Sequence, residues 1–149
     1  MYRRCSAETL WRRFHSPVRD PDPYVTRLMD HPSATTFGVE DGGGDAFFGM
    51  GQFIVDGCSA EVSLIVEDRW QNQGVGSLLL RHMQSELSGV PVEKIYGVFQ
   101  HSNRAIPALL RHLELPLTFT YEGAGDVTVA WKRGCRPVEV GATDRAVKL

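Results

Sequence analysis

The spacing of apolar residues in the first part of the chain predicts two short helices followed by strands. Leu10 and Phe14 lie about one helical turn apart behind Ser6, a residue type that caps helices, and a second helix fits between the prolines of 21–32. Runs rich in β-branched and aromatic residues then predict strands at 34–40, 46–55 and 61–68.

The period of the pattern changes after residue 73. Val75, Leu79, Met83 and Leu87 recur every four residues, with Leu78 beside them, which predicts a helix with one apolar stripe. The remaining apolar runs predict a strand, a helix and two closing strands at 93–100, 104–113, 117–122 and 126–131.

This order of elements predicts an α/β fold with a mixed, mostly antiparallel sheet flanked by helices. Hairpins make antiparallel neighbours, and the strand–helix–strand crossover within 61–100 makes a parallel pair. A length of 149 residues suits one domain, which we assign to 1–132. Residues 133–149 lack a clear period and are expected to form a C-terminal tail.

Composition and charge argue against several classes of protein. Hydrophobic residues make up 42% of the chain and charged residues 23%, and no apolar run approaches the roughly 20 residues of a membrane span. The N-terminus lacks the apolar segment of a secretory signal, so we expect a cytoplasmic protein without membrane association. A net charge of −2 argues against a nucleic-acid partner. Arg3, Arg4, Arg12 and Arg13 form a basic cluster in the sequence, for which a solvated helix face is favoured over a partner site.

The cysteines, Cys5, Cys58 and Cys135, are widely spaced and form no CxxC motif. We expect free thiols rather than a disulfide framework, and neither the cysteines nor the histidines have the spacing of a metal site. Cys58 lies close to Glu61 in the sequence, and we interpret it as a small buried apolar side chain rather than a covalent acetyl carrier.

The stretch RWQNQGVGSLLL, residues 69–80, places two glycines at the start of a predicted helix. Glycine lets a ligand approach the main chain, and a helix N-terminus offers unpaired N–H groups, so the stretch is a candidate phosphate cradle. No lysine follows the glycines, which excludes a P-loop, and Leu79 stands where a dinucleotide fingerprint needs a third glycine or an alanine. What remains is a Q-x-x-G-x-G motif behind a buried strand.

This motif, made by Gln71, Gly74 and Gly76, resembles the R/Q-x-x-G-x-G/A signature of the acyl-CoA site in the GNAT family of N-acetyltransferases. The resemblance extends over about 35–132. Within the family, AEVSLIVEDRWQNQGVGSLLL and SAETLWRRF are similar to segments of the bacterial Pat-type protein lysine acetyltransferases. The resemblance implies a GNAT fold whose splayed parallel strand pair holds acyl-CoA. It also implies acetyl-CoA as cosubstrate, no metal, and an amine as acceptor, and the leading candidate for this amine is a protein lysine.

The same resemblance implies roles for individual residues. Backbone groups of the splayed strand would bind the pantetheine arm (Leu64, Ile65 and Val66). Backbone N–H groups of the loop would hold the pyrophosphate, with two polar residues nearby (Gln73, Gly74, Val75, Gly76 and Ser77, with Gln71 and Asn72). Asn103 matches an asparagine that contacts the cofactor and suits a helix N-cap equally well, and the two roles are compatible.

Acetyl transfer to a lysine requires a base, because the lysine amine has a pKa of about 10.4. Glu61 is the candidate, since it matches the glutamate that opens this strand in Pat-type proteins, and strand alternation places it on one face with Ile65. Glu67 and Asp68 are expected to shape the turn instead. A backbone N–H near Leu64 would polarise the thioester carbonyl.

The sequence departs from the family pattern in two regions. Leu110 stands where many members carry a tyrosine that protonates the leaving thiolate, and Pro107 is expected to shift or kink the start of its helix. Only MYRRC precedes the first helix, so the first strand of the family is missing, very short or replaced by the tail, and a missing edge strand would favour a homodimer. Two alternatives to lysine acetylation stay open: acetylation of a small-molecule amine, and a non-catalytic acyl-CoA-sensing or interaction module.

Overall fold

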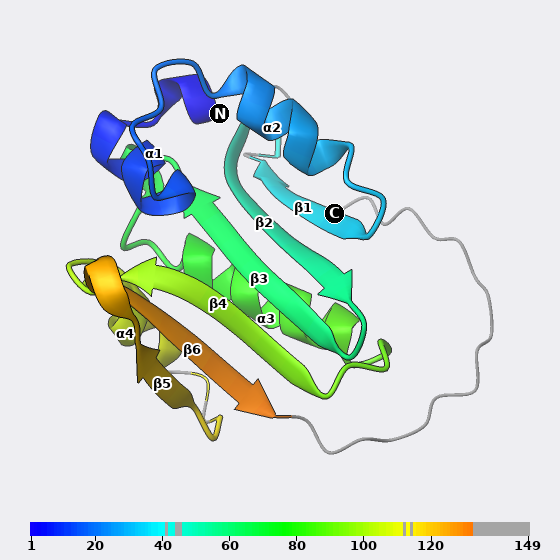
Figure 1. Ribbon diagram of the computed structural model, residues 1–149. Coiled ribbons are helices and arrows are strands. Elements are labelled where there is room, and N and C mark those ends of the chain that lie inside the picture. The colour runs from blue at the N-terminus through cyan, green and yellow to red at the C-terminus, as the bar shows by residue number, and fades with distance from the viewer. Residues whose placement is uncertain (41, 44–45, 112, 114, 133–149) are drawn as a thin grey trace.

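The computed structural model describes residues 1–40, 42–43, 46–111, 113 and 115–132, and the predicted tail lies outside them. A six-stranded sheet in the order β1-β2-β3-β4-β6-β5 has helices on both faces (Figure 1). Its strand pairs are antiparallel except β3 with β4, which is parallel. The predicted α/β fold with a mixed, mostly antiparallel sheet is therefore confirmed.

The elements fall within or beside the predicted segments. The strands are β1 (Ala34–Glu40), β2 (Phe47–Asp56), β3 (Ser59–Val66), β4 (Lys94–Gln100), β5 (Thr118–Tyr121) and β6 (Asp126–Lys132). The helices are α1 (Ala7–Phe14), α2 (Asp22–Met29), α3 (Val75–Leu87) and α4 (Ala105–Leu110). In the described part of the chain no helix is long and apolar enough to cross a membrane.

The apolar stripe of α3 packs against one face of the sheet. Val75, Leu79, Met83 and Leu87 are each at most 9% exposed, which confirms the predicted stripe. The expectation that Leu78 belongs to this apolar stripe is wrong, because its side chain is 56% exposed. An α-helix turns by about 100° per residue, so Leu78 points away from the line through Leu79.

No strand precedes β1 in the described residues. Tyr2–Arg4 form a single 3₁₀ turn, and Tyr2 is buried with Leu10 of α1 and Ile65 of β3. β1 is therefore the first strand of the sheet and lies at its edge. The homodimer expected from an open edge stays a prediction.

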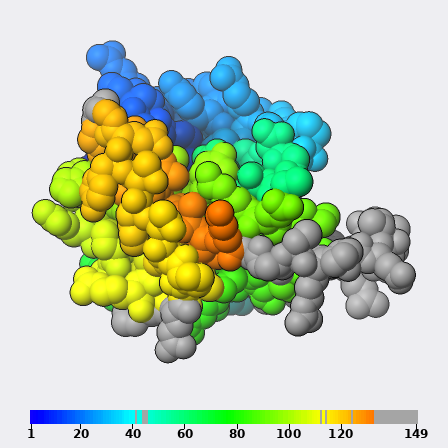
Figure 2. Space-filling model, turned by 60° about the horizontal axis from the view of Figure 1, so that its bottom comes forward, coloured from blue at the N-terminus to red at the C-terminus, as the bar shows by residue number. Residues whose placement is uncertain are grey.

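Helices α1 and α2 lie on the face of the sheet opposite α3 and α4 (Figure 1). The first end of α1 lies at the β3–α3 turn, where the Ser6 hydroxyl donates to Asp68 at 2.6 Å. Its other end lies at the start of β6, where His15 Nδ1 and Asp126 Oδ1 are 3.0 Å apart. Figure 2 shows this second junction as blue N-terminal residues against gold and orange ones. Helix α1 thus crosses over the region between β3 and β6, where the site lies.

Candidate active site

The parallel strands β3 and β4 are paired at one end only. They pair over three residues of each strand, and the last pair is Glu61 with Tyr96. The next residue of β4 is Gly97, where a Cβ atom would come within 3.0 Å of the Val62 carbonyl oxygen. Beyond this close approach the two strands diverge, so the splayed parallel pair is present.

The gap between the diverging strands contains a hollow of about 500 Å³, which we call the cofactor hollow. Its walls come from β3, β4, β6, α1, α3, α4 and the loop that leads into α3. This volume lies within the usual range of small-molecule sites. Most of the predicted cofactor residues line it: Leu64, Ile65, Val66, Gln71, Asn72, Gly74, Gly76, Ser77 and Asn103. Gln73 and Val75 are not among the lining residues, and Val75 is buried in the core instead.

Strand geometry turns the backbone of Leu64 toward the gap. The Glu67 N–H donates to the Phe48 carbonyl of β2 at 2.9 Å, so alternate residues of β3 direct their backbone groups to β2, and Ile65 is one of them. Leu64 has the opposite parity and directs its N–H and C=O toward β4, with which it does not pair. Val66 has the same parity as Leu64, but its carbonyl already accepts a hydrogen bond from Gln71. Of the three predicted backbone contacts, at Leu64, Ile65 and Val66, the geometry therefore favours Leu64.

The loop before α3 adopts left-handed backbone at two positions. Gly74, the N-cap of α3, has φ 85°, and Asn72 has φ 58°. Glycine takes this conformation without a steric penalty, and asparagine tolerates it. Gly74 contributes no side-chain capping bond, and the N–H groups of the first helical turn have no acceptor within the helix. The loop therefore presents unpaired donors, an arrangement suited to a pyrophosphate.

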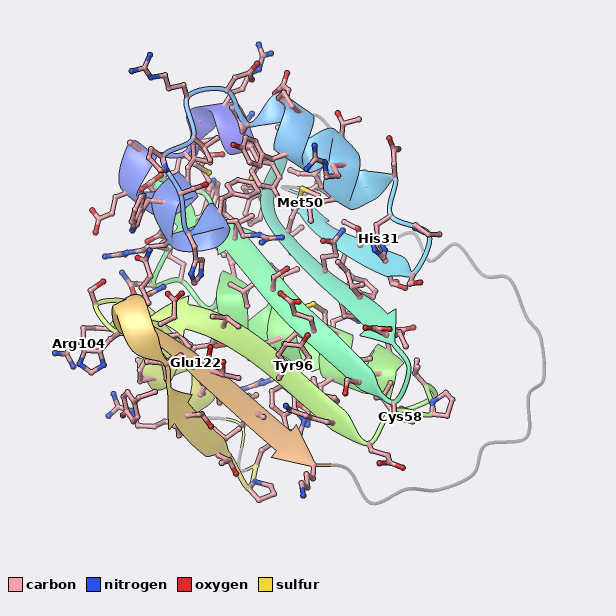
Figure 3. All side chains as sticks on the ribbon, in the orientation of Figure 1. His31, Met50, Cys58, Tyr96, Arg104 and Glu122 are labelled. Carbon is pink, nitrogen blue, oxygen red and sulfur yellow. The ribbon has the colours of Figure 1, made fainter. Side chains whose placement is uncertain are left out.

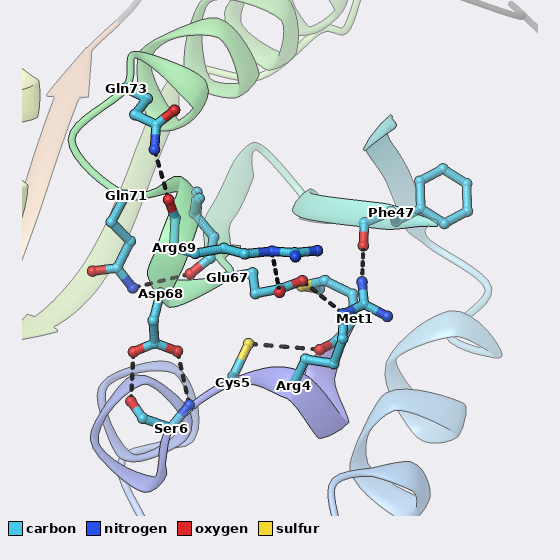
Figure 4. A network of polar contacts seen from close by, with 11 residues as sticks. Met1, Arg4, Cys5, Ser6, Phe47, Glu67, Asp68, Arg69, Gln71 and Gln73 are labelled. Carbon is cyan, nitrogen blue, oxygen red and sulfur yellow. Dashed lines mark hydrogen bonds and ion pairs between the residues drawn. The ribbon is translucent and has the colours of Figure 1, made fainter. Parts of the chain in front are cut away.

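Gln71, the first residue of the motif, has a structural role that the sequence did not reveal. Its Nε2 donates to the Val66 carbonyl at 3.0 Å and to the Thr9 hydroxyl at 3.1 Å. Gln73 Nε2 donates to the Arg69 carbonyl at 2.6 Å (Figure 4). Both amides thus stabilise the turn, and Gln71 also joins the end of β3 to α1.

The acidic residues before the loop bind the N-terminal segment (Figure 4). Glu67 is 4% exposed and forms an ion pair with Arg4 at 2.9 Å. Asp68 accepts hydrogen bonds from the Ser6 N–H at 2.8 Å and from the Thr9 hydroxyl at 2.8 Å. These contacts fasten the turn to the N-terminal segment and α1, and Glu67 also pairs with Arg69 inside the turn at 2.8 Å.

Asp68→Asn is expected to remove a pH-dependent part of the stability. Partial burial on its own would raise the pKa of the Asp68 carboxyl, but hydrogen bonds from Ser6 and Thr9 outweigh it and hold the pKa below its usual value of 3.8. Because folding lowers this pKa, the stabilisation is complete above the unfolded-state pKa and is lost as the pH falls through the folded-state pKa. Urea unfolding should show the wild type to be more stable than the variant at pH 7, with the difference shrinking between about pH 5 and pH 2. A difference that stays constant over this range would contradict the role.

Glu61 lies where the cofactor hollow meets a second one on the other side of the gap. The second hollow, of about 350 Å³, is bounded by α1, α2, β3 and β4, and we call it the acceptor hollow. Glu61, Arg13 and Val98 line both hollows. Among the described residues that line either hollow, Glu61 is the only carboxylate.

Tyr96 is a neighbour of Glu61 that the sequence pattern does not reveal, although it lines neither hollow. Its hydroxyl donates to Glu61 Oε2 at 3.4 Å, a long hydrogen bond, and Figure 3 shows it on the open face of β4. Burial, and then the charge of Glu61, raise the pKa of Tyr96. Only the parallel register of β3 and β4 places the two side chains together, and the sequence pattern does not reveal that register.

Helix α4 forms the wall opposite the glycine loop. Asn103 is 8% exposed, and its Oδ1 accepts the Ala105 N–H at 3.2 Å. The N-cap residue of α4 is Arg104, so Asn103 lies one residue before the predicted capping position. Leu110 is 5% exposed and has no proton to donate. Pro107 is the third residue of α4, a position whose N–H has no helical acceptor, so it removes no hydrogen bond from the helix.

The described cysteines, Cys5 and Cys58, are free thiols, and Cys135 lies outside the described residues. The expectation that Cys58 is buried is wrong, because it is exposed in the β2–β3 turn (Figure 3). Burial raises the pKa of Cys5 to about 11. Neither cysteine lines a hollow, and no group of three or more potential metal ligands occurs among the described residues.

Comparison with known proteins agrees with this geometry. The model of the acetyltransferase (GNAT) family matches residues 6–113. No curated protein sequence gives a significant match. The GNAT domain of S. lividans PAT is 20% identical with a TM-score of 0.76, over 89% of this chain and 81% of that one.

Two further solved structures share the fold. The ribosomal-protein-S18-alanine N-acetyltransferase of Escherichia coli is 17% identical with a TM-score of 0.65, over 91% of this chain and 90% of that one. Campylobacter jejuni N-acetyltransferase PseH, in complex with acetyl coenzyme A, is 18% identical with a TM-score of 0.58, over 75% of this chain and 77% of that one. At these identities the structural likeness shows the fold alone.

Proposed function

The chain belongs to the GNAT family of acetyltransferases, and from that premise we propose that it transfers acetyl from acetyl-CoA directly to the side-chain amine of a protein lysine. The observation that carries the proposal is the position of Glu61. It is the one carboxylate among the described residues that line the two hollows, and it lies where they meet. An amine entering from the acceptor hollow would therefore meet a base before it reaches the thioester.

The cofactor hollow suits acetyl-CoA. Backbone donors at the start of α3 would hold the pyrophosphate, and the free edge of β3 at Leu64 would pair with the amides of the pantetheine arm. At Gly76 a Cβ atom would approach only carbon atoms of Leu109 and Leu64, at 3.8 to 3.9 Å, so the hollow is open in front of this glycine. When bound, acetyl-CoA supplies a thioester whose carbonyl carbon accepts the amine nitrogen.

Direct transfer is favoured over a covalent acetyl-enzyme. Glu61 would take the proton of the amine, the new C–N bond would form as the C–S bond breaks, and the Leu64 N–H would donate to the carbonyl oxygen. CoA would leave as the thiolate, for which Leu110 provides no acid. A cysteine carrier would need an accessible thiolate, whereas Cys5 has a raised pKa and lines neither hollow.

Two features support a protein as the acceptor. The rim of the acceptor hollow includes Tyr24 and Arg27, both exposed on α2, so the hollow opens to solvent and an extended side chain can enter from a larger partner. Among the proteins with this fold, the Escherichia coli enzyme is named for a ribosomal-protein acceptor.

Incubation with acetyl-CoA and a cell lysate is expected to yield acetyl-lysine in specific proteins, detected by mass spectrometry of tryptic peptides. A panel of small amines, followed by release of free CoA, should give little turnover. Reactions with Glu61→Gln protein serve as the control for non-enzymatic acetylation. Turnover of small amines alone would exclude the lysine acceptor. Binding of acetyl-CoA in a thermal-shift assay without turnover of any acceptor would instead indicate a sensing module.

A further inference from the structure

The arginines near the N-terminus do not act as one cluster in the structure. Arg3, Arg4 and Arg12 each pair with a carboxylate, provided by Asp22, Glu67 and Glu8 respectively. Arg13 forms no ion pair within the described residues; it interacts with the hydroxyl of Tyr2, and it lines both hollows. The expectation that the basic cluster forms a solvated helix face therefore fits Arg13 poorly.

A second guanidinium faces the acceptor hollow from α2. Arg27 lines this hollow, and no carboxylate of the described residues lies within ion-pair distance of it. Arg13 is packed beside Phe14, with its guanidinium carbon 5.3 Å from the ring centre. The histidine of this hollow, His15, is already partnered by Asp126. Two cationic groups from two helices thus lie around the entrance to Glu61.

This arrangement is unfavourable for an ordinary lysine segment. A protonated amine entering the hollow meets Arg13 and Arg27, and like charges repel it. Glu61 provides one negative charge, and this carboxylate has to take up the proton of the amine. An acceptor that brings its own anionic group would complete the charge balance, because guanidinium groups bind carboxylates through paired hydrogen bonds.

We propose that the acceptor carries a carboxylate beside its amine and that Arg13 and Arg27 bind this carboxylate. This inference rests on the proposed lysine acetylation, and it implies that the acceptor lysine is flanked by an aspartate or a glutamate. The free carboxylate of a small amino acid offers the same chemistry, so the test separates these two sources. Segments rich in further lysines would be rejected by the same charges.

The test compares three peptide series that share one acceptor lysine. The flanking residues are Asp and Glu in the first, Asn and Gln in the second, and Lys in the third. Acetylation is followed by mass spectrometry with kcat and KM determined separately. We expect kcat/KM to be about fivefold higher for the acidic series than for the neutral one, because the acidic peptides have a lower KM. Pairs of amino acids and their decarboxylated amines form the small-molecule arm.

Arg27→Glu is the informative variant, and Arg81→Glu is its matched control. Both residues are exposed on helices, but Arg81 lies on α3, on the opposite face of the sheet, and lines neither hollow. We expect Arg27→Glu to invert the preference, so that the lysine-flanked series has the lower KM, and Arg81→Glu to leave the preference unchanged. Arg13→Gln should lower the preference without inverting it.

The outcomes distinguish the carboxylate inference from the proposed lysine acetylation. Equal kcat/KM for acidic and neutral peptides would overturn the carboxylate inference while lysine acetylation stands. A preference for amino acids over their decarboxylated amines, with peptides unmodified, would overturn lysine acetylation and support the inference. If no acceptor turns over, fluorescence anisotropy of labelled acidic and neutral peptides with CoA present decides the matter, since equal Kd values overturn the inference.

Discussion

Glu61→Gln is expected to reduce kcat by about 10²- to 10⁴-fold, the usual contribution of a positioned general base. The amide keeps the shape of the side chain but cannot take a proton from the amine. The affinity for acetyl-CoA should stay within about twofold, because the predicted cofactor contacts come from the glycine loop and the backbone of β3 and do not involve this carboxylate. Steady-state kinetics and calorimetric titration with acetyl-CoA measure the two quantities.

Glu86→Gln provides the matched control for this change. Glu86 is an exposed residue of α3 and lines neither hollow. The same chemical change at this position should leave kcat unaltered. Full turnover in Glu61→Gln would remove Glu61 from the mechanism, whereas loss of acetyl-CoA affinity in the same variant would indicate that the carboxylate has a binding role.

Gly76→Leu should lower the affinity for acetyl-CoA by roughly a hundredfold or more, about 2.7 kcal/mol or more. Gly76 lines the cofactor hollow in the first turn of α3, and its missing side chain leaves the hollow open between α3 and α4. A leucine side chain would extend into the space proposed for the pyrophosphate and pantetheine arm. Leucine favours helices more than glycine does, so the variant should fold, which circular dichroism and urea unfolding can verify.

Gly76→Ala separates the effect of volume from that of backbone. Its Cβ atom would make only ordinary contacts, at 3.8 Å from Leu109 and 3.9 Å from Leu64. Alanine should therefore retain acetyl-CoA affinity within a few-fold of wild type and raise stability by at most about 1 kcal/mol. Wild-type affinity in Gly76→Leu would contradict the placement of the cofactor in this hollow.

Local pattern was enough to predict the elements that build the site. The four-residue spacing from Val75 to Leu87 gave a buried helix face, and the apolar segment within 61–68 gave the inner strand β3. Two glycines at the start of a helix indicated unpaired backbone donors. These features depend on interactions between neighbours in the chain, so their signals are contained within a few residues of sequence.

Gln71 makes a long-range contact that the local sequence pattern does not predict. As the first residue of a cofactor motif it was placed near the pyrophosphate, whereas its side chain reaches Thr9, 62 positions away in the sequence. Asp68 reaches Ser6 over the same separation. Such contacts depend on how α1 is seated on the sheet, and no periodicity in either segment encodes that geometry.

The sequence by itself thus determined the helices, the strands and the glycine loop, because each rests on a short stretch of residues, and the order of these elements determined the fold class. The role of Glu61 as the base rests on the family resemblance and stays a prediction. The tertiary structure alone brought Tyr96 to Glu61, through the register of a parallel strand pair that starts more than thirty residues apart in the chain. It also placed Arg13 and Arg27, from separate helices, around one hollow. Side chains from distant segments meet only after strand register and helix position are set, and these are settled by packing of the whole core.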